Sequence, residues 1–113
     1  MNQFEFIFEP IRPVTPAGPE SATIAQRFAK FHQDNPHVYS MLVSLARGLQ
    51  ARRPRKLGIG MLFEVLRWQY YVQTDTDEEY KLNNNYRAQY ARLIMEQEPD
   101  LHEAFNTRPS QAD

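Results

Sequence analysis

The chain has 113 residues, enough for one domain with a single core, and 42% apolar with 24% charged residues is ordinary for a globular protein. A net charge of −1 argues against a polycation that binds nucleic acid with its whole surface, and against an acidic mimic of DNA. The absence of cysteine excludes disulfides, thiolate metal ligands and cysteine nucleophiles. With no long apolar run and no signal-peptide pattern, we expect a cytoplasmic protein.

The N-terminal stretch QFEFIFE alternates phenylalanine with mostly polar residues, which predicts a β-strand with Phe4, Phe6 and Phe8 on one side. A lone strand is not stable, so it must pair within the chain or with a second copy, as in a homodimer. A proline-rich linker follows. We therefore expect a strand and linker over 1–18, a helical domain over 19–108 and a frayed tail over 109–113.

Apolar residues recur at helical spacing in four segments and predict helices over about 20–33, 35–53, 59–71 and 84–98. Asn35-Pro36 is a start signal in which the asparagine side chain caps the helix. Pro99 predicts one further helical turn. Residues 70–74 and 79–82 predict a hairpin that could pair with the N-terminal strand. The expected fold is a single, mainly α domain of four helices plus a short terminal turn, helix-turn-helix-like with a wing.

The sequence offers little enzymatic chemistry. His32, His37 and His102 do not fall into a metal-ligand spacing. There is no glycine-rich phosphate loop, and no serine stands in a nucleophile-elbow context. We therefore expect no enzyme, no metal and no cofactor.

The basic segment, defined as Arg52, Arg53, Arg55 and Lys56, is the clearest electrostatic feature. These side chains could neutralise phosphates and release counterions. Alternatively, cations at the end of a helix favour its dipole and remain solvated. The sequence does not separate the two interpretations.

The stretch LNNNYRAQY at 82–90 lies at the start of the fourth predicted helix. In helix-turn-helix proteins this position carries side chains to base edges, so Arg87 and Gln89, with Asn85 as a second-rank candidate, are the expected DNA contacts. The alternative is that Asn83 or Asn84 only caps the helix. Tyr86 and Tyr90, four residues apart, are expected on its buried side. The preceding connection is also longer than in a compact helix-turn-helix, so an elaborated variant would be needed.

The aromatic residues of FEVLRWQYY form a third candidate. We expect the third helix to be central and buried on most sides. If Trp68 and Tyr71 are instead exposed, they would mark a protein-binding surface. Glu64 and Arg67 are three residues apart and are expected to pair along the helix.

Residues 31–108 resemble a family of small, largely uncharacterised proteins encoded by bacteriophages and prophages. The resemblance rests on FHQDNPHVYSMLVSLAR, GIGMLFEVLRW and KLNNNYRAQYARLIMEQEPDLHEAF. It implies a bacterial cytoplasm and a product that acts on DNA or on a host protein. The favoured expectation is a phage-type DNA-binding regulator that uses the fourth helix and the basic segment. The alternative is a non-catalytic protein that binds and inhibits a host enzyme or defence complex.

Overall fold

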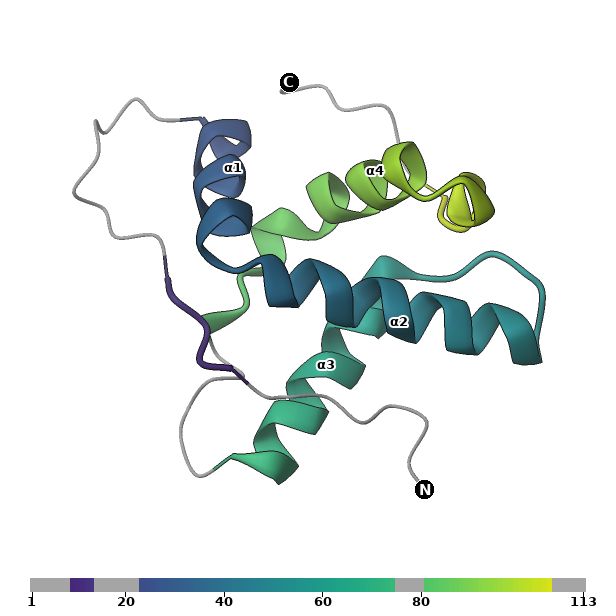
Figure 1. Ribbon diagram of the computed structural model, residues 1–113, viewed down its shortest axis with the longest axis horizontal. Helices are drawn as coiled ribbons and strands as arrows, with labels where there is room; N and C mark the ends of the chain where they lie inside the picture. Colours follow the sequence, from purple (N-terminus) through teal and green to yellow (C-terminus); the bar gives the residue numbers. More distant parts are fainter. Residues whose placement is uncertain (1–8, 14–22, 75–80, 107–113) are drawn as a thin grey trace.

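The computed structural model describes residues 9–13, 23–74 and 81–106 (Figure 1). The predicted Phe4–Phe8 strand, its pairing with a second copy, and the predicted frayed tail lie outside these residues. The described part folds as one compact, all-α domain, which confirms the predicted class. No helix within it is long and apolar enough to cross a membrane.

Four α-helices and two short 3-10 turns follow one another in the described residues. They are α1 (Ile24–Asp34), α2 (Pro36–Arg52), α3 (Ile59–Gln73), η2 (Asn84–Tyr86), α4 (Arg87–Gln97) and η3 (Pro99–Leu101). A capping box starts α1, with Thr23 Oγ1 accepting from Gln26 N–H and Gln26 Oε1 accepting from Thr23 N–H. The predicted turn at Pro99 is present as η3.

The prediction of a hairpin after the third helix is wrong for its first strand, residues 70–74. Residues 70–73 form the last turn of α3, and the N–H of Thr74 still donates to the carbonyl of Tyr70 at 3.0 Å. The aromatic and β-branched composition favoured a strand, but the buried ring of Tyr70 continues the apolar face of the helix. The described residues contain no strand, only an isolated parallel bridge between Leu57 and Phe105.

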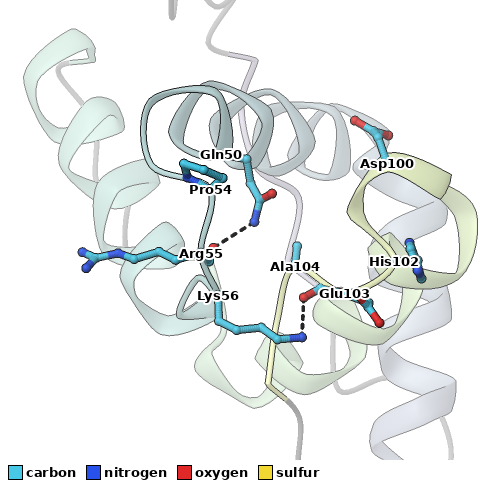
Figure 2. A pocket seen from close by; sticks show the side chains of 8 residues that line it. All are labelled: Gln50, Pro54, Arg55, Lys56, Asp100, His102, Glu103 and Ala104. Atoms are coloured by element: carbon cyan, nitrogen blue, oxygen red, sulfur yellow. Dashed lines mark hydrogen bonds between the residues drawn. The ribbon is translucent and has the colours of Figure 1, made fainter.

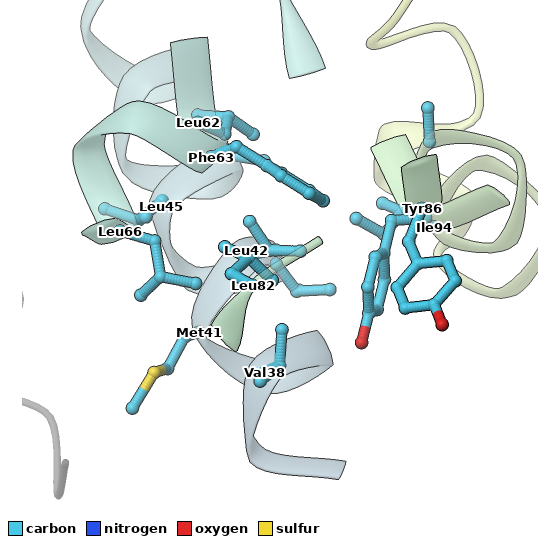
Figure 3. Packing of buried hydrophobic residues seen from close by; sticks show 14 of the residues in the cluster. Val38, Met41, Leu42, Leu45, Leu62, Phe63, Leu66, Leu82, Tyr86 and Ile94 are labelled. Atoms are coloured by element: carbon cyan, nitrogen blue, oxygen red, sulfur yellow. The ribbon is translucent and has the colours of Figure 1, made fainter. Parts of the chain in front are cut away.

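The core lies where α2, α3 and α4 meet, and α1 covers the end of α2 that is nearest to η2 (Figure 1). Figure 3 shows side chains from α2, α3 and the 82–94 region converging on one apolar interior. Leu42, Leu66 and Ile94 are fully buried there. Burial of each such side chain stabilises the fold by about 1.5–3 kcal/mol.

Asn35 precedes α2, as predicted, but its side chain does not cap the helix. It is fully buried, and its carboxamide holds the extended segment at residue 12. The N–H of Arg12 donates to Asn35 Oδ1 at 2.7 Å, and Asn35 Nδ2 donates to the carbonyls of Arg12 at 2.8 Å and Phe31 at 3.0 Å. Asn35 therefore joins the N-terminal segment to the helices, and Ile11 is buried beside it.

Candidate functional site

The basic segment is exposed where α2 ends and the connection to α3 begins. Its side chains do not all point to one place: in Figure 2, Arg55 points away from the neighbouring depression, whereas Lys56 turns toward Glu103. Lys56 Nζ donates to the carbonyl of Glu103 at 2.5 Å, and Gln50 Nε2 donates to the carbonyl of Arg55 at 2.9 Å. The segment is therefore partly fixed against the chain that follows η3.

The depression beside the basic segment has a volume of about 360 Å³ and carries both signs of charge (Figure 2). Asp100 and Glu103 line it together with Lys56 and His102. Asp100 is also held by Arg47, whose Nε donates to Asp100 Oδ2 at 2.8 Å, and this contact lowers the pKa of Asp100. Carboxylates at this position oppose the binding of a phosphate.

The triple asparagine begins a 3-10 turn rather than the α-helix itself. Asn83 caps it, since its Oδ1 accepts from Asn85 N–H at 2.9 Å, which is one of the two predicted capping choices. The side chain of Asn84 accepts a hydrogen bond from Arg67 of α3. Arg67 Nη2 also donates to the carbonyl of Leu82 at 2.6 Å. Asn83 thus caps the 3-10 turn, and Asn84 and the carbonyl of Leu82 hold the chain against α3.

The predicted base-contacting residues have different surroundings. Asn85 is exposed. Arg87 is exposed too, but its Nε donates to the carbonyl of Asn84 at 3.2 Å, and its guanidinium lies against Gly60. Gln89 does not face outward as expected: it is half-buried, and its Oε1 is enclosed without a hydrogen-bond partner among the described residues. The buried face of α4 is wider than the Tyr86–Tyr90 spacing indicated.

The two halves of the expected DNA surface lie at different ends of α4. The basic segment leads to Leu57, whose N–H donates to the carbonyl of Ala104 at 2.8 Å, beyond the C-terminal end of α4. The asparagines lie before its N-terminal end, where η2 packs against α1. A helix of 11 residues is about 16 Å long. The two groups do not form one cluster.

The third helix is not buried on most sides, and this expectation was wrong. Leu62, Phe63, Leu66 and Tyr70 face the core and are fully buried. On the opposite face Trp68 is 63% exposed and Tyr71 62% exposed. Their rings stack on each other, with centroids 5.9 Å apart and planes at 27°. α2 and α4 both pack on the same half of α3, which leaves the other half open.

Trp68 belongs to a longer apolar stripe, which we call the α3 seam: Met61, Val65, Trp68 and Val72. Met61 is 48% exposed, Val72 is 50% exposed and Val65 is half-buried. Tyr71 and Glu64 flank the seam on one side. Glu64 pairs with Arg67 as predicted, with Arg67 Nη1 2.6 Å from Glu64 Oε1. The sequence shows the spacing of four, three and four residues. The buried face of the same helix has a similar period, however, so spacing alone does not tell which face is exposed.

A small polar network lies on the far side of α2 from the α3 seam. Arg47 Nη2 donates to Glu98 Oε1 at 2.6 Å, and Tyr39 Oη donates to Glu98 Oε2 at 2.8 Å. Burial and the contact with Glu98 raise the pKa of Tyr39. The described residues contain no group of three histidines or carboxylates that could hold a metal ion. This network connects α2 to the segment after α4 and offers no free nucleophile or base.

No family model, curated protein or solved structure matches the chain.

Proposed function

We propose that this chain is a non-catalytic protein-binding module that docks a partner through the α3 seam and Tyr71. One observation carries the proposal: two large aromatic side chains, Trp68 and Tyr71, are each more than 60% exposed and stacked beside other apolar residues. Exposed aromatics grouped in this way mark interaction sites on soluble proteins, and Trp and Tyr are the residues most enriched at binding hot spots.

The chemistry of the surface favours a protein partner over nucleic acid. The α3 seam carries no charge, and Glu64, the acidic residue that flanks it among the described residues, would repel a phosphate. Charge depletion at the centre with a polar edge is the usual composition of the core of a protein interface. The phage setting implied by the resemblance would make a host enzyme or defence complex one class of partner.

Affinity capture from a lysate of the encoding bacterium tests this proposal. The wild-type chain should retain a partner in defined stoichiometry, and the double variant W68S/Y71S should lose it. Both positions are exposed, so the fold should tolerate the change to within about 0.5 kcal/mol. Ile24→Ser is the matched control, since Ile24 is a 41% exposed apolar residue on α1. Equal retention by the wild type and W68S/Y71S would contradict the proposal.

A second candidate function is DNA binding by an elaborated helix-turn-helix-like fold, favoured by the exposure of Arg52, Arg53 and Arg55. Such binding would weaken steeply with salt, because phosphate contacts release counterions. Arg52→Ala and Arg53→Ala should each reduce the salt slope by about 1. Arg27→Ala on α1 is the control, as Arg27 is also exposed. No binding to duplex DNA at low salt would exclude this function.

A further inference from the structure

The α3 seam has the spacing of a helix–helix contact. Its residues are spaced four, three and four apart. Alternating spacings of three and four are the pattern by which two helices pack against each other along a narrow apolar stripe. From Met61 to Val72 the seam extends for about 16 Å, or three turns. An occupant that matches this pattern is therefore a helix with its own apolar stripe.

The same spacing is obtained when the seam is followed from either end. Two identical helices that run antiparallel would therefore place Met61 of each copy against Val72 of the other, and Val65 against Trp68. This self-complementarity is what a two-fold symmetric interface requires, since each residue pair then occurs twice. We propose that the occupant of the α3 seam is α3 of a second copy of this chain, packed antiparallel.

The polar flank of the seam also matches its own copy. In the antiparallel arrangement Glu64 of one copy lies beside Tyr71 of the other, because both residues occupy the same edge of the stripe. The side chain of Glu64 is 70% exposed and has an oxygen free to accept from a phenol. A parallel arrangement would instead place this edge of the two copies on opposite sides of the contact, so that Glu64 of one copy would not meet Tyr71 of the other.

The seam is small for a protein interface. An aromatic side chain covers roughly 150–250 Å² when it is buried, so Trp68 and Tyr71 together present on the order of 200 Å². With Met61 and Val72 the seam reaches a few hundred Å² per copy. A standard interface buries about 800 Å² per partner. We therefore expect a dimer that forms only at elevated protein concentration.

This inference rests on the proposed function and names its partner. Trp68 is the only tryptophan in the chain, so its emission reports the seam directly. On raising the concentration of the full chain, tryptophan emission should shift to the blue as sedimentation shows dimers. Trp68→Glu should raise the dimer dissociation constant by about tenfold or more, since a carboxylate would be buried without a partner. Ile24→Glu should leave the constant unchanged.

Disulfide cross-linking tests the antiparallel arrangement. The chain has no cysteine of its own, so each variant carries a single thiol at a chosen position. Under mild oxidation, a mixture of M61C and V72C chains should form the mixed disulfide in preference to either homodimer. Ile24→Cys, in an exposed position outside the seam, should form none. Circular dichroism checks that each variant keeps its helices. Homodimers of M61C alone would overturn the antiparallel packing.

The outcomes separate this inference from the proposed function. A wild type that stays monomeric at all concentrations, yet loses a captured partner on Trp68→Glu, would overturn the dimer and leave the docking function standing. Dimers without a captured partner would uphold both, with the second copy as the docked partner. A monomer without a captured partner would overturn both.

Discussion

The two faces of α3 have nearly the same apolar content and opposite surroundings. Leu66 and Tyr70 are fully buried, whereas Trp68 and Tyr71, one or two residues away, are among the most exposed apolar side chains described. A helix that is apolar all round is normally buried. Here α2 and α4 cover only one half of it. The apolar residues of α3 therefore divide into a buried face that holds the fold together and a face that no described element covers.

Truncating one residue on each face gives the largest expected contrast. Leu66→Ala should lower the free energy of unfolding by about 2–5 kcal/mol, because it leaves a cavity in the core. Trp68→Ala should change it by less than about 0.5 kcal/mol, since the ring packs mostly against Tyr71 and solvent. Urea denaturation measures both. A loss below about 1 kcal/mol at Leu66 would mean that the buried face is not the core.

Two asparagines provide a second contrast between a buried and an exposed residue. Asn35→Ala should cost about 1–3 kcal/mol, because the backbone N–H and carbonyl of Arg12 lose their partners. Asn85→Ala, at an exposed position, should cost almost nothing. Thermal unfolding of both variants checks this. Equal midpoints would show that Asn35 does not hold the N-terminal segment.

Removing the hydroxyl group from either of two neighbouring tyrosines on α3 compares its buried face with its exposed face. Tyr70 Oη donates to the carbonyl of Glu9 at 2.9 Å, so Tyr70→Phe should cost about 0.5–1.5 kcal/mol. Tyr71→Phe should leave stability unchanged and keep the stacking with Trp68. Chemical denaturation measures the free energy of unfolding of both variants. An equal loss of stability at both positions would contradict the division of α3 into a buried and an exposed face.

The smallest expected effect is a pH dependence from His32. Burial lowers the pKa of His32 below its ordinary value of 6.5, and its Nδ1 has no hydrogen-bond partner among the described residues. The unfolded chain therefore binds the proton more tightly, so stability is full above about pH 6.5 and falls as the pH drops below it. His32→Leu should flatten this part of the pH profile. A wild-type profile that stays flat between pH 7 and 5 would contradict the buried, neutral ring.

The stretch LNNNYRAQY shows where prediction from sequence stops. Its helix, a cap at Asn83 or Asn84 and the buried pair Tyr86 and Tyr90 were predicted, since capping and periodicity are local properties, and Asn83 is the residue that caps. The hydrogen bond from Arg67 to the side chain of Asn84 was not predicted, because those residues are 17 apart in the chain. The enclosure of Gln89 likewise depends on what packs against α4. Local rules identify a helix face but not the neighbour that covers it.

The sequence by itself determined four helices, their approximate ends and the turn at Pro99. These follow from periodicity, proline positions and capping, which act over a few residues. Only the tertiary structure decided that α3 is covered on one face, that it continues through residues 72–73, and that Asn35 binds the chain at Arg12. Those outcomes depend on contacts between distant segments, and the apolar residues of α3 are alike on both faces until α2 and α4 pack against one of them.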